Sequence, residues 1–180
     1  MRPTAVRRRS APLEVVLLNQ QRRRRIPAGR LRRVIQDAAR ALRVSGEVAL
    51  VLTSDAPVRR LNARYRHQDK ATDVLSFPGP HGGRFAPGVK KRRSRIHSGD
   101  SESREVGLGD IVISLDRAAR NAPRFGRTLS QELEILTLHG FLHILGYDHE
   151  TDDGTMDRLE SRLRKRLIGT GARSARERPS

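Results

Sequence analysis

The 180-residue sequence contains no cysteine, which narrows the kinds of site that it can build. Disulfide bonds are excluded, and any metal site must use histidine and carboxylate side chains instead of thiolates. Long apolar runs are also missing. Nothing approaches the ~20 residues that span a bilayer, and the basic start of the chain lacks the apolar segment of a signal peptide. We therefore expect a cytoplasmic protein with no membrane partner.

Lysine and aromatic residues are scarce. Only four of the 37 basic residues are lysine, the formal net charge is +17, and aromatic residues make up 3% of the chain. Arginine pairs bidentately with phosphate, so this balance favours a nucleic-acid partner, although charge runs are commonly just solvated surface. With so few aromatic rings, the composition favours contact with phosphates over stacking on bases.

The chain length fits one domain with tails. Residues 1–12 are basic, residues 169–180 are polar, and neither shows apolar periodicity, so we expect two disordered tails. Residues 79–106 combine glycine, proline and serine with a basic cluster, which predicts a flexible basic loop or, alternatively, an RNA contact. The folded domain is expected over residues 13–168.

Within that range, apolar strand-like stretches alternate with amphipathic ones. The strand-like stretches lie at 13–18, 48–53, 72–77 and 109–115. Helical spacing is found at 27–43, 55–66, from 116 onward, at 128–146 and at 155–167. The sequence therefore predicts an α+β fold, a single domain with a mixed sheet of about four strands and about five helices.

The predicted helix at 128–146 is unusual because apolar side chains cover nearly all of its circumference. Leu133, Leu138, Phe141 and Ile144 point in different directions around a helical wheel. A helix that is apolar on every side is normally buried among other elements. We expect this helix to lie at the centre of the domain.

Three histidines lie at the end of that helix, in the segment HGFLHILGYDH. His139 and His143 are four residues apart, so their side chains project from one face of a helix. Gly146 suits a left-handed backbone turn that ends the helix and returns His149 toward the other two. Three imidazoles with a fourth place open to water are typical of a catalytic zinc site, so we predict one Zn²⁺ per chain.

A lone histidine here would more simply be a hydrogen-bonded core residue. Three together at these offsets favour a metal, because unpaired ring nitrogens in an apolar surround would each cost roughly 1–3 kcal/mol. The spacing also matches the ligands of metzincin proteases, which carry a glutamate base directly after the first histidine. This chain has Gly140 there, and glycine cannot accept a proton. Protease chemistry of that kind is therefore disfavoured.

Three motifs in this order resemble those of the YbeY family of bacterial endoribonucleases and rRNA maturation factors. They are HGFLHILGYDH at 139–149, LNARYRHQDKATDVLSFPGP at 61–80, and LGDIVIS at 108–114. The likeness extends over about residues 13–168. It implies an α+β, metal-dependent, single-strand-specific endoribonuclease, usually with zinc, that acts in 16S rRNA 3′-end maturation and ribosome quality control. Ribosomes or ribosomal proteins become expected partners.

The resemblance also implies roles for particular residues. The metal ligands of the family fall on His139, His143 and His149, and its arginine falls on Arg66. A guanidinium beside the metal can hold a scissile phosphate and stabilise developing charge, so Arg66 is the predicted catalytic and RNA-binding residue.

Other residues of the motifs receive weaker roles. Lys70 and Ser76 are predicted to bind RNA beside the cleft. Asp148 is predicted to orient a ligand imidazole, although an aspartate there can equally cap or turn the chain, and Asp73 stays open between such roles. The long basic segment at 79–106 departs from the family pattern, in which a much shorter connection is typical.

Two functions remain open from the sequence. The first is a zinc-dependent endoribonuclease, for which no general base is evident among the motif residues. The second is a non-catalytic ribosome-assembly factor in which the metal holds the fold and the basic surface docks on rRNA or a ribosomal protein.

Overall fold

A computed structural model describes four stretches of the chain: residues 12–21, 24–80, 107–149 and 152–168. The strands are β1 (Glu14–Asn19), β2 (Glu47–Thr53), β3 (Val74–Pro78) and β4 (Gly107–Ser114). The helices are α1 (Ala28–Leu42), α2 (Asp55–Arg66), α3 (Leu115–Arg124), α4 (Leu129–Ile144) and α5 (Thr155–Leu167). The predicted α+β class is confirmed. The predicted tails, apart from Pro12, and the loop from residue 81 onward lie outside the described residues.

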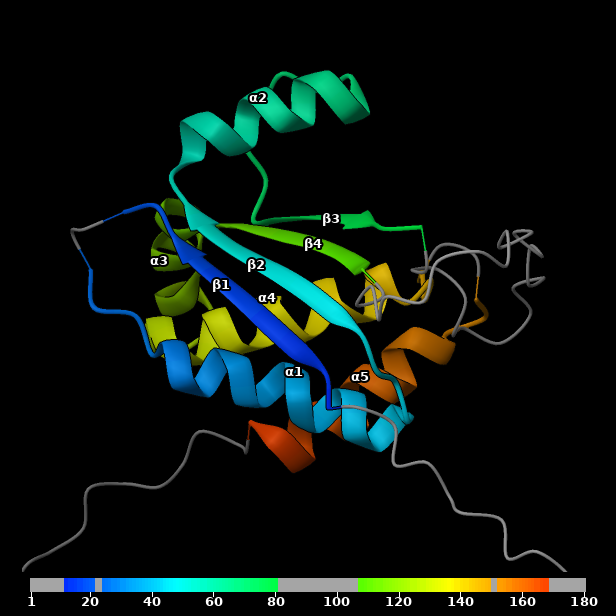
Figure 1. Ribbon diagram of the computed structural model, residues 1–180. Coiled ribbons are helices and arrows are strands. Elements are labelled where there is room, and N and C mark those ends of the chain that lie inside the picture. Colours follow the sequence, from blue (N-terminus) through cyan, green and yellow to red (C-terminus); the bar gives the residue numbers. More distant parts are fainter. Residues whose placement is uncertain (1–11, 22–23, 81–106, 150–151, 169–180) are drawn as a thin grey trace, which may run out of the picture.

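The four strands form one mixed sheet in the order β1-β2-β4-β3. β1, β2 and β4 are parallel, and β3 joins the edge antiparallel to β4. Parallel neighbours need a crossover connection, and α1 supplies it between β1 and β2. Helices α1, α4 and α5 cover one face of the sheet, while α2 lies on the other (Figure 1).

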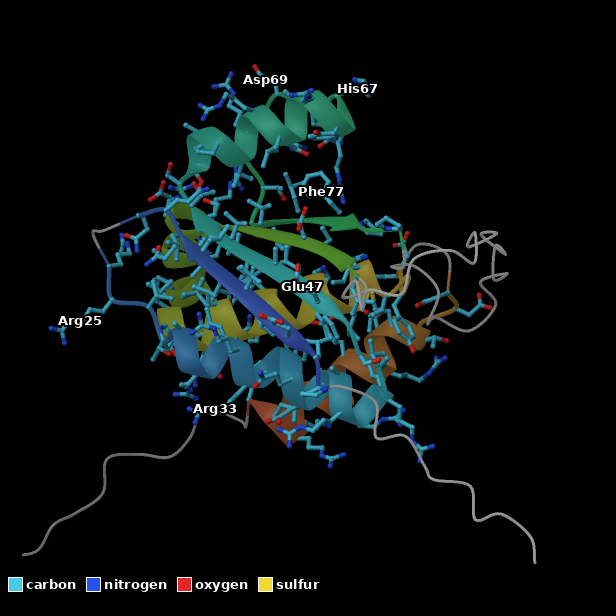
Figure 2. The ribbon with its side chains drawn as sticks, in the orientation of Figure 1. Arg25, Arg33, Glu47, His67, Asp69 and Phe77 are labelled. Carbon is cyan, nitrogen blue, oxygen red and sulfur yellow. The ribbon has the colours of Figure 1, made fainter. Side chains whose placement is uncertain are left out.

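Alternate side chains of the central strands β2 and β4 face opposite sides of the sheet and contribute to two cores. Ile111 and Ile113 of β4 are fully buried on the face that packs against α1 and α4. Val112, between them, joins Val58 of α2 in a smaller cluster, against which Phe77 packs from β3 (Figure 2). The larger core is therefore the one that fixes the position of α4.

Helix α4 is central, as the sequence predicts. It contacts α1, α3, α5, β3 and β4 (Figure 1). Even its acidic residues are buried: Glu134 is paired with Arg30, and Glu132 with Arg127. No helix in the described part of the chain is long and apolar enough to cross a membrane.

Both ends of α4 are defined by local hydrogen bonds. Thr128 and Gln131 form a capping box at its start. Its last helical residue is Ile144, not Gly146, because the backbone there changes to a glycine-terminated turn. Gly146 N–H donates to the His143 carbonyl, and Tyr147 N–H donates to the Leu142 carbonyl. Gly146 has φ 94°, the left-handed conformation expected from the sequence.

Several other boundaries differ from those predicted by one or two residues, and two of them have a clear local cause. β3 begins at Val74 instead of residue 72, because its pairing with β4 starts at Val74 opposite Ile113. Helix α3 begins at Leu115, one residue earlier than expected, because the Ser114 side chain accepts a hydrogen bond from Arg117 N–H and caps the helix.

Candidate metal centre

His139 and His143 project from one face of α4. Their Nε2 atoms lie 3.1 Å apart, and their ring centroids lie 4.6 Å apart. The side chain of His139 is 23% exposed, so the pair is reached from a cavity at the surface. Two imidazole nitrogens at this separation can share a hydrogen bond, and the same separation also suits two ligands of one ion.

The turn at Gly146 brings His149 to the same place. Its ring centroid lies 5.0 Å from that of His139 and 5.1 Å from that of His143. One nitrogen from each of the three histidines lies within 4.8 Å of the others, so the group could hold a metal ion. The structure therefore brings together the three predicted ligands, while their binding of a metal stays a prediction.

Two carboxylates on α5 hold the outer ring nitrogens. Glu160 Oε2 lies 3.1 Å from His139 Nδ1, and Asp157 Oδ1 lies 3.2 Å from His149 Nδ1. With Nδ1 of these two rings engaged, Nε2 is the nitrogen left to face an ion. Sequence reasoning missed both carboxylates, although their spacing of three residues on an amphipathic helix places them on one face.

Asp148, the residue predicted to orient a ligand, is half-buried next to His149 in sequence. Its negative charge favours a higher pKa for the His143 imidazole and so opposes the larger effects that lower this pKa. The orienting role of Asp148 stays a prediction, whereas hydrogen bonds place Glu160 and Asp157 directly behind the other two rings.

The electrostatics keep His143 neutral. Burial of its ring, then the charges of His139 and His149, then that of Arg66, outweigh the Asp148 carboxylate and lower the pKa of His143 to about 4. A neutral imidazole offers its lone pair to a metal at neutral pH.

Glu160 stays ionised despite being only 5% exposed. Burial would raise its pKa, but the hydrogen bond and charge of His139, together with Arg164, bring the pKa below its usual value. Arg164 Nη2 lies 2.6 Å from Glu160 Oε1. An anionic carboxylate behind an imidazole increases the basicity of the ring toward a metal.

Gly140, where metzincins carry their base, lies close against the sheet. A Cβ there would lie 2.6 Å from Cγ2 of Ile111 and 3.2 Å from Oγ of Ser76. The carbonyl of Gly140 accepts a hydrogen bond from Ser76 Oγ at 3.2 Å. Glycine is therefore required by packing here.

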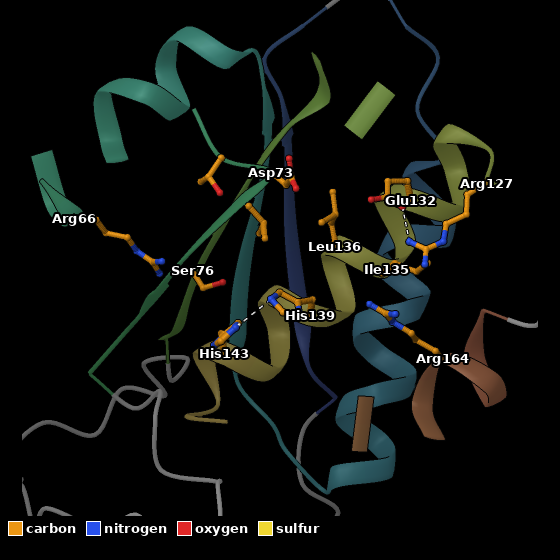
Figure 3. A pocket seen from close by; sticks show the side chains of 12 residues that line it. Arg66, Asp73, Ser76, Arg127, Glu132, Ile135, Leu136, His139, His143 and Arg164 are labelled. Atoms are coloured by element: carbon orange, nitrogen blue, oxygen red, sulfur yellow. Dashed lines mark hydrogen bonds and ion pairs between the residues drawn. The ribbon is translucent and has the colours of Figure 1, made fainter. Parts of the chain in front are cut away.

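A cavity of about 400 Å³ opens beside the histidines. Among the residues that line it are Arg66, Ser76, His139 and His143, which come from α2, β3 and α4 (Figure 3). Lys70 is exposed and does not line this cavity, so its predicted RNA contact would lie elsewhere on the surface. The roles of Arg66, Ser76 and Lys70 stay predictions.

The donor set fits a catalytic divalent ion. Three imidazole nitrogens as ligands would leave at least one coordination place for a substrate or water. A fully enclosed structural site would need a fourth protein ligand, and in the described part of the chain the group consists of the three histidines alone. The arrangement suits polarisation of a bound substrate or water.

Comparisons with known proteins show which family this chain resembles. The family model described as "Endoribonuclease YbeY" matches residues 16–168. A protein of that name from Solibacter usitatus is 44% identical over 152 residues, covering 80% of this chain and 84% of the relative. Another from Moorella thermoacetica is 43% identical over 150 residues, covering 79% and 86%.

A solved structure supports the fold. The solution structure of a Thermotoga maritima protein has a TM-score of 0.55 at 22% identity, covering 86% of this chain and 89% of the other. The resemblance drawn from the three sequence motifs is confirmed by the family match, which spans both the histidine segment and Arg66. This chain belongs to the Endoribonuclease YbeY family.

Proposed function

We propose that this protein is a single-strand-specific, zinc-dependent endoribonuclease that acts in the cytoplasm on 16S rRNA, in 3′-end maturation and ribosome quality control. The observation that carries the proposal is the convergence of three imidazole nitrogens at a cavity that an arginine enters. Ribosomes or ribosomal proteins are the proposed partners, in keeping with the excess of positive charge.

His139, His143 and His149 would hold one zinc ion, with Glu160 and Asp157 fixing two of the rings. Zinc in such a site supplies Lewis acidity to a phosphoryl oxygen and to the attacking water. The rings of His139 and His149 are then unavailable as proton carriers, because a carboxylate contacts Nδ1 of each ring and Nε2 would bind the metal.

Arg66 is the residue proposed to hold the scissile phosphate. It lies at the end of α2, lines the cavity together with His143, and makes no ion pair with another residue that the structure describes. A guanidinium without a carboxylate partner keeps all of its N–H donors for phosphate oxygens, and its charge stabilises the transition state.

Removal of a proton from the attacking water is the step for which the cavity offers the least support. The carboxylates that line the cavity are Asp73 and Glu132. Asp73 accepts a hydrogen bond from Asn121, and Glu132 is paired with Arg127 at 2.8 Å. Because both are already engaged, neither is well placed to take a proton from water, and we expect slow turnover.

The proposal is tested by cleavage of single-stranded RNA by His143→Ala and Arg66→Ala, with Arg60→Ala as the matched control. Arg60 lies on the same helix, is exposed and does not line the cavity. We expect cleavage to fall at least about 100-fold in both site variants and to be unchanged in the control. Full activity of both folded site variants would instead favour the assembly factor with a structural metal.

A further inference from the structure

Two arginines line the cavity on the side opposite Arg66. In Figure 3, Arg66 enters from one side, Arg127 and Arg164 enter from the other, and His139 and His143 lie between them. The proposed metal centre thus has cationic groups on two sides. Arg66 is the residue proposed to hold the phosphate at the metal. Arg127 and Arg164 are therefore left without a proposed role.

Arg127 and Arg164 are each held in place by an ion pair with a buried glutamate. Arg127 Nη1 lies 2.8 Å from Glu132 Oε2, and Arg164 Nη2 lies 2.6 Å from Glu160 Oε1. The arginine side chains are 31% and 37% exposed, whereas those of the two glutamates are 4% and 7% exposed. The carboxylates therefore lie inward, and the two arginine side chains are partly exposed. The Nε atom of Arg164 is buried and has no hydrogen-bond partner among the described residues.

Each guanidinium keeps donors to spare. An arginine has five N–H donors in a fixed plane, and each of these ion pairs joins one guanidinium nitrogen to one carboxylate oxygen. A guanidinium that is already immobilised loses little rotamer entropy when it binds an anion. Arg127 and Arg164 can thus bind a second anionic group, besides the phosphate at Arg66.

The lining also indicates what kind of anion it takes. Among the described residues that line the cavity there is no phenylalanine, tyrosine or tryptophan, and the only rings in its lining are the imidazoles of His139 and His143. The exposed Phe125 lies outside this lining, with its ring centroid 5.0 Å from Cζ of Arg127. The arginines are suited to phosphate oxygens, and a single strand of RNA presents one phosphate per nucleotide.

We propose that Arg127 and Arg164 bind the RNA phosphate next to the phosphodiester that is cleaved. This inference rests on the proposed function, because it takes the scissile phosphate to lie at the histidines with Arg66. It makes the site favour positions of a strand that have a neighbouring phosphate on the side of these two arginines.

The test uses RNA oligonucleotides in which one phosphate is replaced by a neutral methylphosphonate. The replacement is placed next to the cleaved bond on the 5′ side, on the 3′ side, or three nucleotides away. For the wild-type protein we expect kcat/KM to fall about tenfold for one of the two adjacent positions, the usual effect of losing a charge-assisted hydrogen bond. The distant replacement should have no effect.

The variants are Arg127→Gln and Arg164→Gln, with Arg124→Gln and Arg162→Gln as controls of equal charge. Both control residues are exposed and do not line the cavity. We expect each site variant to cleave unmodified RNA about tenfold more slowly and to lose most of the methylphosphonate penalty. The controls should behave like the wild type.

Arg127→Gln leaves the buried Glu132 carboxylate without its partner. The double variant Arg127→Gln/Glu132→Gln removes that unpaired charge and is therefore measured alongside it. Arg164→Gln could also act through Glu160 and His139, but a general weakening of the metal centre would slow all oligonucleotides equally and preserve the penalty. A preserved penalty in the site variants, or no penalty in the wild type, overturns the inference. If His143→Ala still cleaves, the proposed function fails instead.

Discussion

At the scale of single residues, Gly140 determines how closely the histidine-bearing helix meets the sheet. The position corresponds to the base of a metzincin, and the sequence alone shows only that the base is missing. The structure adds a packing reason, because Cγ2 of the fully buried Ile111 occupies the space that a Cβ would need.

Gly140→Ala is expected to lower the free energy of unfolding. Overpacking against a β-branched neighbour costs about 1–3 kcal/mol, which exceeds the roughly 1 kcal/mol that alanine gains in a helix. Urea denaturation measures the change. Gly29→Ala is the control, since Gly29 lies in α1 with nothing within 4 Å of its added Cβ. Equal stability of the two variants would contradict the packing argument.

Glu160 and Asp157, the carboxylates that contact the histidine rings, differ in burial. Their substitution should therefore weaken zinc binding to different extents. Glu160 is 5% exposed, whereas the side chain of Asp157 is 70% exposed. Glu160→Gln should weaken zinc binding about 10–100-fold, and Asp157→Asn much less, because water can replace an exposed acceptor. Competition with a chelating dye measures both affinities. A larger loss of zinc affinity in Asp157→Asn than in Glu160→Gln would contradict this prediction.

At the scale of elements, local sequence signals predicted where most helices and strands lie. The capping box at Thr128 and the left-handed Gly146 depend on neighbouring residues, so α4 could be anticipated nearly to its ends. The start of β3 could not be, because it depends on its pairing with β4, far along the chain. Sequence signals likewise could not place Glu160 behind His139, because two helices must first pack together.

Asp55 joins three elements and should make stability depend on pH. It begins α2, and its carboxylate accepts hydrogen bonds from Ser114 at the end of β4 and from Arg120 of α3. Burial would raise its pKa, but Ser114 and then Arg120 bring the pKa below 3.8. Its stabilisation is therefore fully present above pH 3.8 and is lost as the pH falls through the lowered pKa.

Asp55→Asn should destabilise the protein by about 1 kcal/mol at pH 7, a modest value because solvent reaches the ion pair. The difference from the wild type should shrink as the pH falls below 3.8. Thermal unfolding at several pH values measures it. Asp69→Asn serves as the control, since Asp69 is paired with Arg59 on the open surface. A difference that persists in acid would refute the assignment to the ionised carboxylate.

At the scale of the whole molecule, the group of three histidines lies beside the core and is not part of it. The main cluster of buried apolar residues includes Phe141 and Leu142 of α4, whereas none of the three histidines belongs to it. A metal at the histidines would therefore add to the stability of a fold that already has its own core.

Chelation of zinc is expected to leave the protein folded. Binding at 100 times the dissociation constant contributes about 2.7 kcal/mol, which corresponds to about 5–10 °C in Tm for a chain of this size. Circular dichroism with and without chelator measures the change, and re-addition of zinc should restore Tm. Loss of the folded signal on chelation would show that the metal is structural.

The sequence by itself determined the α+β class, the buried central helix and the convergence of His139, His143 and His149. These follow from periodicity and from a local turn, which act over a few residues. Only the tertiary structure decided which acids support the rings, why Gly140 is glycine, and that Arg127 and Arg164 share a cavity with Arg66. Those contacts join segments far apart in the chain, and no local pattern encodes the packing that brings them together.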